Sequence, residues 1–246
     1  MADWEYASEL IKEKNSLSYH PFQYDPAKEK LLDIQNSSCM HTFDWQYFYE
    51  DIWCAKKIYE YNPDWHWDVG SSVDGFISHL LSFRENINLI DIRPIQSDIE
   101  GVCYTCADAT DMSGIEDESI ESLSALCSVE HFGLGRYGDP IDPNAWSKAL
   151  HSFERVVKPG GHLYISVPVG NKNRLCFNAH RVFEIDTIIN TFQDMELLEL
   201  SMVVNYTLEK VLWKDDDTVK RNEEILDLLK SGKLNMNFGM FEFVKR

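Results

Sequence analysis

Short apolar runs alternate with amphipathic stretches through the middle of the chain, between about residues 65 and 205. The first pattern is typical of buried β-strands and the second of helices packed on a sheet. Strands are predicted over residues 65–70, 87–92, 101–107, 120–128, 162–167, 195–206 and 236–245. Helices are predicted over residues 76–84, 143–157, 184–192 and 215–233, with a sharp turn at 158–161. This alternation predicts an α/β fold with a largely parallel sheet covered on both faces.

An aromatic-rich segment precedes this alternation. A helix is predicted from Phe43 through Trp53, with apolar residues 45, 48, 49, 52 and 53 on one face, and Asn62-Pro63 stops it. We therefore divide the chain into an N-terminal helical extension, residues 1–62, and an α/β domain, residues 63–246. The extension either covers the sheet or forms a cap or lid over a substrate. The last strand is expected to form a hairpin with the strand before it and to close an edge of the sheet.

Composition narrows the possible partners. The 246 residues are 44% hydrophobic and carry a formal net charge of −18, which repels nucleic-acid phosphates and anionic lipid surfaces. No window approaches the roughly 18–20 apolar residues that a membrane span needs, and the start does not read as a signal peptide. The expected location is therefore the cytoplasm. The pair Cys103 and Cys106 lacks a second pair for zinc, and we interpret both as buried side chains.

A glycine turn follows the first predicted strand, in Asp68-Val-Gly-Ser-Ser-Val-Asp-Gly75. Glycine after a strand lets the backbone turn tightly and lets a ligand approach closely. Such turns bind several nucleotide cofactors, NAD among them, and some are plain turns.

Acidic residues follow the next two predicted strands. Asp91 ends the second strand, where a carboxylate accepts hydrogen bonds from ribose hydroxyls in nucleotide-binding folds, although a turn cap is the alternative. After the third strand, the carboxylate of Asp108 can accept from an adenine amino group and the next backbone N–H can donate to the ring. Asp111, close by, can be a helix cap.

A fourth feature, Ser128-Val-Glu-His131, follows the fourth strand, and Val-Lys-Pro-Gly-Gly161 precedes the fifth. In this order the set resembles the class I S-adenosylmethionine-dependent methyltransferases. That resemblance implies a Rossmann-like sheet of seven strands, mostly parallel with the last strand antiparallel, with helices on both faces and S-adenosylmethionine as cofactor. It implies that Asp68 and Gly70 hold the methionine part, Asp91 the ribose, and Asp108 with Ala109 the adenine. The residues assigned to the cofactor are Asp68, Gly70, Ser71, Gly75, Asp91, Ile92, Asp108, Ala109 and Ser128.

The glycine turn departs from that family, which commonly places glycines at every second position. Here Ser72 and Asp74 stand at two of those positions, and Gly75 comes one step late. The segments 130–140 and 177–183 resemble an uncharacterised branch of the superfamily, a domain-of-unknown-function family. The resemblance implies a setting in surface-polysaccharide or other glycan synthesis.

Candidate catalytic residues cluster after the fourth and fifth strands. His131 is the first candidate base, since its ordinary pKa of about 6.5 suits proton removal near neutrality; His180 is a second, and Asp139 lies between them in sequence. The loop that contains Arg136 and Tyr137, and the residue Arg181, offer hydrogen-bond donors for a polar or acidic acceptor. The structural alternatives are a strand cap at His131 and an ordinary surface turn at the loop. We expect no metal ion, although His131, Asp139 and His180 offer metal-ligand chemistry.

The sequence therefore predicts an O-methyltransferase for a small polar acceptor such as a sugar or glycan precursor. Two alternatives stay open. A nicotinamide-dependent oxidoreductase shares the glycine turn and the acidic residue after the second strand. A non-catalytic S-adenosylmethionine-binding protein shares the whole cofactor set.

Overall fold

The computed structural model describes residues 45–93, 98–176, 179–216, 218–234 and 237–246. The chain divides into two units, Met1–Phe43 and Asp44–Arg246, and the described residues all lie in the second. The predicted N-terminal helix is α2 (Trp45–Tyr61); Phe43 and residue 44 lie outside the described residues. This helix belongs to the second unit, which thus begins before the predicted boundary at residue 63. A role of the extension as cap or lid stays a prediction.

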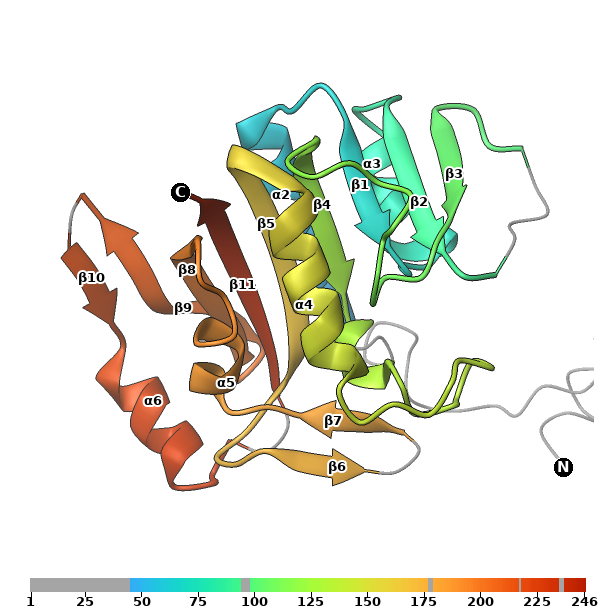
Figure 1. Cartoon of the computed structure of the whole chain (residues 1–246). Coiled ribbons are helices and arrows are strands. Elements are labelled where there is room, and N and C mark those ends of the chain that lie inside the picture. Colours follow the sequence, from blue (N-terminus) through green and yellow to red (C-terminus); the bar gives the residue numbers. More distant parts are fainter. Residues whose placement is uncertain (1–44, 94–97, 177–178, 217, 235–236) are drawn as a thin grey trace, which may run out of the picture. The chain divides into compact units, whose positions relative to one another are not determined.

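A nine-stranded sheet forms the centre of the unit, in the order β10-β9-β8-β11-β5-β4-β1-β2-β3 (Figure 1). Its strands are β1 (His66–Val69), β2 (Ile87–Asp91), β3 (Val102–Cys106), β4 (Ile120–Leu126), β5 (Val157–Val169), β8 (Met195–Val204), β9 (Thr207–Asp215), β10 (Thr218–Arg221) and β11 (Asn237–Lys245). Neighbouring strands from β3 to β5 pair in parallel, and β11 pairs antiparallel with both β5 and β8. The Rossmann-like α/β class and the antiparallel last strand are confirmed.

The strand count and the place of the last strand differ from the predictions. Strands β9 and β10 add two antiparallel strands beyond the expected seven. Asp215 ends β9 and residues 218–221 form β10, where a helix was predicted. The tail helix is α6 (Glu223–Lys230), capped by the Asn222 side chain. Strand β11 lies between β5 and β8 rather than at an edge, so the edges are β10 and β3 (Figure 1).

Helices cover both faces of the sheet (Figure 1). On one face lie α2, the π-helical turn Val73–Ile77 and α3 (Ser78–Leu81), which replace the helix predicted over 76–84. On the other lie α4 (Ala145–Val156), α5 (Ile185–Ile189) and α6. A separate two-stranded ribbon, β6 (Arg174–Cys176) with β7 (His180–Val182), follows β5.

Charged side chains anchor α2 to the sheet. Lys57 Nζ lies 2.9 Å from Glu199 Oε2 and 2.7 Å from Glu242 Oε2, and Trp53 Nε1 donates to Glu199 Oε1 at 2.9 Å. Burial opposes ionisation of Glu199, but hydrogen bonds from Lys210 and Trp53, with Lys57, outweigh it and bring its pKa to about 2. The face that contacts the sheet is centred on Trp53, Cys54 and Ile58. The predicted apolar face of this helix included Phe48, which is 44% exposed. The face that contacts the sheet is therefore shifted from the predicted one.

Two local predictions were wrong. Residues 158–161 do not form a separate turn, because α4 ends at Val156 and β5 begins at Val157, with a register irregularity against β4. Cys103 and Cys106 are exposed rather than buried, because β3 is an edge strand.

Candidate functional site

One cavity of about 260 Å³ lies at the carboxyl ends of β1, β2, β3 and β4. This is where open α/β sheets bind ligands. Its volume is near the lower end of small-molecule sites, which begin at about 300 Å³. Nine of the predicted site residues line it: Gly70, Asp91, Ile92, Asp108, Ala109, Ser128, His131, Tyr137 and Asp139. Asp68, Ser71, Gly75, Arg136, His180 and Arg181 do not line it.

The turn after β1 needs glycine at position 70. Gly70 has a φ of 77°, in the left-handed region, and a Cβ there would lie 3.4 Å from the Cβ of Ser128. The buried carboxylate of Asp68 stabilises the turn, because it accepts hydrogen bonds from Ser71 N at 3.0 Å and Ser71 Oγ at 2.9 Å. Ser124 Oγ also donates to Asp68. Asp68 therefore positions the turn and does not line the cavity, and its contact with the methionine part stays a prediction.

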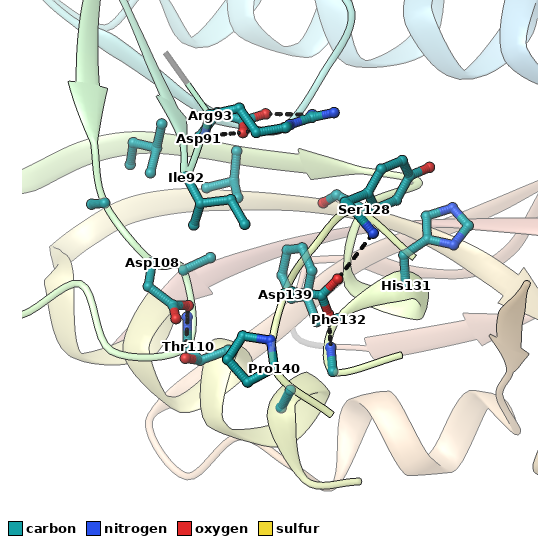
Figure 2. A pocket seen from close by; sticks show the side chains of 18 of the residues that line it. Asp91, Ile92, Arg93, Asp108, Thr110, Ser128, His131, Phe132, Asp139 and Pro140 are labelled. Carbon is teal, nitrogen blue, oxygen red and sulfur yellow. Dashed lines mark hydrogen bonds and ion pairs between the residues drawn. The ribbon is translucent and has the colours of Figure 1, made fainter. Parts of the chain in front are cut away.

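The carboxylate expected to hold ribose is paired with a neighbouring arginine. Arg93 Nε donates to Asp91 Oδ1 at 2.9 Å and Arg93 Nη2 donates to Asp91 Oδ2 at 2.7 Å, as Figure 2 shows. Partial burial raises the pKa of Asp91, but the hydrogen bonds and charge of Arg93 lower it by more. The pKa of Asp91 therefore lies below its usual range. Asp91 is therefore ionised near neutrality.

Asp91 and Asp108 line the same cavity, and Ile92 lies between them in Figure 2. Asp108 accepts from Thr110 N at 2.8 Å and Thr110 Oγ at 2.7 Å through Oδ1. Both of these hydrogen bonds use one oxygen, so Oδ2 is the oxygen left for a ligand. The side chain of Ile92 is 41% exposed and offers an apolar surface between the two carboxylates.

Ser128, at the tip of β4, is 6% exposed and lines the cavity. Within the described residues its hydroxyl has no hydrogen-bond partner. Buried hydroxyls are nearly always satisfied in proteins. This unpartnered group therefore marks a place where a ligand can supply the missing hydrogen bond.

Sequence reasoning missed a buried acidic cluster beside this tip. Cys127 lines the cavity with a φ of 45°, and its thiol donates to Glu50 Oε2 of α2 at 3.1 Å. Burial raises the pKa of Glu50 well above its usual range. Burial also raises the pKa of Glu130 to about 8, and Oε2 of Glu130 has no partner in the described part of the chain. No local signal pairs positions 77 residues apart, so only the fold shows this contact.

The imidazole of His131 lies at the far side of the cavity from Asp91 and Asp108 (Figure 2). Its Nδ1 lies 2.6 Å from the carbonyl oxygen of Ala179. A carbonyl only accepts, so Nδ1 carries the proton and Nε2 keeps its lone pair. Burial lowers the pKa of His131, aided by the charges of Arg136 and His180, although the Ala179 carbonyl opposes the shift. The ring is thus a neutral proton acceptor near neutrality.

The loop after β4 is organised by Asp139. Its Oδ2 accepts from Gly133 N at 2.8 Å and Gly135 N at 3.3 Å, and its Oδ1 accepts from Tyr137 N at 3.1 Å. Burial raises the pKa of Asp139, and these backbone hydrogen bonds lower it to below the usual range. The carboxylate lines the cavity, but its oxygens hold the loop (Figure 2). Its geometry is that of a positioning residue, whereas the sequence placed it among the catalytic ones.

The structure also gives Arg181 a different task from acceptor binding. The guanidinium is buried and donates to the backbone carbonyl of Phe132 at 2.6 Å, with longer contacts to the carbonyls of Glu130 and Pro143. These contacts tie β7 to the His131 segment. Arg136 donates to the Ala179 carbonyl at 3.0 Å, the same oxygen that His131 contacts. His180 lies on β7 outside the cavity. Its pKa is lowered by burial and then by the positive charge of Arg136.

No group of three or more metal-ligating side chains lies close together in the part of the chain that the structure describes, so His131, Asp139 and His180 do not form such a group. Among the described helices, none is long and apolar enough to cross a membrane.

Comparisons with solved structures identify the fold. One similar structure is the 1,6-didemethyltoxoflavin-N1-methyltransferase of Burkholderia thailandensis, solved with 1,6-didemethyltoxoflavin and S-adenosylhomocysteine. It is 12% identical, and the match covers 82% of this chain and 80% of that chain, with a TM-score of 0.53. The chain has the Rossmann-like methyltransferase fold. The [4+2]-cyclase SpnF shares this methyltransferase fold at 14% identity, 79% and 81% coverage and a TM-score of 0.52.

The sequence itself matches a family described as Caenorhabditis protein of unknown function, DUF268, over residues 108–212. This match spans β4, the loop organised by Asp139 and the β6–β7 ribbon, which include the two segments that resemble an uncharacterised branch. Among curated proteins, none matches the sequence.

Proposed function

We propose that this chain is an S-adenosylmethionine-dependent methyltransferase that methylates a hydroxyl group of a small polar acceptor, such as a sugar or glycan precursor. One observation carries the proposal: a single cavity brings together the Gly70 turn, Asp91, Asp108 and the Ser128–His131 segment from four successive strand ends. A structurally similar methyltransferase solved with S-adenosylhomocysteine supports the choice of cofactor. The glycan setting rests on the sequence resemblance.

The cavity fits the cofactor chemically. The Gly70 turn leaves open the space that a Cβ would occupy against Ser128, a cavity residue whose hydroxyl has no partner among the described residues. Asp91 offers two acceptor oxygens to a ribose diol, in place of its contacts with Arg93. Ile92 and Ala109 would pack on the adenine faces, and Asp108 would accept from the exocyclic amine. When bound there, the cofactor supplies an electrophilic methyl group.

His131 would remove the proton of the acceptor hydroxyl. With Nδ1–H donated to the Ala179 carbonyl, Nε2 is the nitrogen that takes the proton. Glu130 Oε1 lies 3.7 Å from Nε2, so ionisation of Glu130 would stabilise the resulting imidazolium. Orientation of the hydroxyl against the methyl group supplies much of the rate, and general-base catalysis typically adds about 10²–10⁴-fold.

Calorimetry and turnover test the proposal. The chain is titrated with S-adenosylmethionine and with NAD, and then screened with nucleotide sugars and short glycans for release of S-adenosylhomocysteine. Binding of the sulfonium cofactor with turnover on a hydroxyl-bearing acceptor is the expected result. Binding of NAD alone would contradict the proposal and favour the oxidoreductase instead.

A second candidate is a protein of this fold that binds the cofactor without transferring its methyl group. The [4+2]-cyclase supports this candidate, because its similar fold is associated with a reaction other than methyl transfer. Tight cofactor binding with no S-adenosylhomocysteine released from any acceptor in the panel would favour it.

A further inference from the structure

Two guanidinium groups meet at one aromatic ring on the rim of the cavity. Arg93 Cζ lies 5.1 Å from the centre of the Tyr137 ring, and Arg136 Cζ lies 5.3 Å from it. Arg93 follows β2 and Arg136 lies in the loop after β4, so the two cations come from separate elements. Cations favour the face of an aromatic ring, but two like charges at one ring repel each other. Their convergence is unexpected in a chain with a net charge of −18.

The β6–β7 ribbon, next to the carbonyl that Arg136 contacts, adds a third arginine, Arg174 on β6. Arg174 pairs with Val182 in the ribbon, and His180 lies one diagonal step away. Arg136 donates to the carbonyl of Ala179 at 3.0 Å, immediately before His180 at the start of β7, so the ribbon reaches Arg136. After burial, the charges of Arg136 and Arg174 also lower the pKa of His180. The side chain of Arg174 is exposed.

The nearby carboxylates do not neutralise all of these cations. Asp139 directs its oxygens to three backbone N–H groups, and Asp91 forms its ion pair with Arg93. Arg136 donates to a backbone carbonyl and makes no ion pair with a carboxylate among the residues that the structure describes. Asp91 and Asp139 keep their own negative charges, but the three guanidinium groups still offer N–H donors from which an anion can accept.

We propose that Arg93, Arg136 and Arg174 form an anion subsite at the rim of the cavity that binds a phosphate or carboxylate group of the acceptor. This inference rests on the proposed function only in assigning the anion to the acceptor of methyl transfer. Arginine presents a planar pair of N–H donors that matches the oxygens of either group. Tyr137 is the platform on which two of the three guanidinium groups rest.

The pairing of Asp91 with Arg93 links this subsite to the cofactor. A ribose that takes the Asp91 oxygens removes both hydrogen bonds from Arg93. The freed guanidinium side chain, 56% exposed, then has a strong partner in an anionic acceptor. Cofactor and anion should therefore bind with positive coupling, each strengthening the other.

Three matched sugars test the subsite: glucose, glucose 1-phosphate and glucuronate share a hydroxyl-rich ring and differ in charge. Each is titrated into the full chain at physiological salt, with and without S-adenosylhomocysteine. At least one anionic sugar should bind at least tenfold more tightly than glucose, and which one does identifies the group. Arg136→Gln and Arg174→Gln should each reduce that preference several-fold. Arg221→Gln, an exposed arginine on the distant edge strand β10, is the matched control and should keep it.

Equal binding of all three sugars, or an anion preference that survives both substitutions, would overturn the subsite. Melting temperatures of the variants separate loss of binding from loss of fold. The titrations without S-adenosylhomocysteine keep this inference distinct from the proposed function. If S-adenosylhomocysteine does not bind while the anion preference persists, the proposed function fails and the subsite stands.

Discussion

Arg93 occupies both oxygens of Asp91, at 2.9 and 2.7 Å, in the cavity where ribose is expected to bind. The guanidinium is largely exposed, and exposed ion pairs contribute only about 0.2–1 kcal/mol. A ribose diol can therefore displace it at little cost.

This competition predicts the effect of removing Arg93. Arg93→Gln should tighten S-adenosylhomocysteine binding by up to about fivefold, because the cofactor no longer has to displace an ion pair worth up to about 1 kcal/mol. Isothermal titration calorimetry on both proteins measures the change. A tenfold loss of affinity in Arg93→Gln would instead show that Arg93 itself contacts the cofactor.

His131 should matter for turnover and little for cofactor binding. We expect His131→Ala to lower kcat by about 10²–10⁴-fold, because the acceptor proton then lacks its base. The S-adenosylhomocysteine Kd should change little. His151→Ala, at an exposed position on α4, is the control for loss of a histidine. Unchanged turnover in His131→Ala would remove it as the base.

The rate should also depend on pH in a stated direction. A base acts when deprotonated, so kcat/KM should rise with pH through an apparent pKa below the usual value of about 6.5, because burial lowers the pKa of His131. The rate should then level off near neutrality. A rise centred above pH 7.5 would point to another group.

Glu130 gives a prediction for stability. Burial raises its pKa from 4.5 to about 8 in the folded chain, so the folded state holds a proton there that the unfolded state releases. The stability gained from holding this proton on Glu130 is fully present below about pH 4.5 and is lost as the pH rises to about 8. Over that window the wild type should lose unfolding free energy relative to Glu130→Gln, by at most about 1.4 kcal/mol per pH unit. Urea denaturation at several pH values measures this difference, and parallel curves would contradict it.

Gly133 gives a conformational test of the loop organised by Asp139. Its φ is 72°, and a Cβ there would lie 2.0 Å from the carbonyl oxygen of Asp142. Gly138 has a φ of 85° and has no heavy atom near its would-be Cβ, so it is a matched control. We expect Gly138→Ala to cost about 1–2 kcal/mol and Gly133→Ala clearly more, because the clash adds to the strain. Equal costs in urea denaturation would contradict the structure of this loop.

The parallel half of the sheet could be predicted from the sequence because its strands are buried and bounded by glycine, proline or acidic residues. Strand β2, for example, is buried along its apolar residues and ends at Asp91. Strand β10 could not be predicted, since all four of its residues are exposed and carry no apolar alternation. The acidic run before it resembles the start of a helix.

That Gly70, Asp91, Asp108 and Ser128 line one cavity could be predicted, because they follow successive strands and strand ends meet at one edge. The acceptor end of the site was less predictable. Arg181 resembles a ligand group in sequence, and only the folded chain shows the carbonyls of Phe132, Glu130 and Pro143 turned toward it. The contact between Glu50 and Cys127 joins the helix before the domain core to the tip of β4, which no local pattern encodes.

A crystal structure of the chain grown with S-adenosylhomocysteine tests the cofactor site most directly. We predict the ribose hydroxyls on the Asp91 carboxylate, the adenine beside Ile92 with its amine at Asp108, and the amino-acid end over the Gly70 turn near Ser128. Arg93 should have left Asp91. A structure with S-adenosylhomocysteine bound elsewhere, or with Arg93 still paired to Asp91 and the cavity empty, would contradict the assignment.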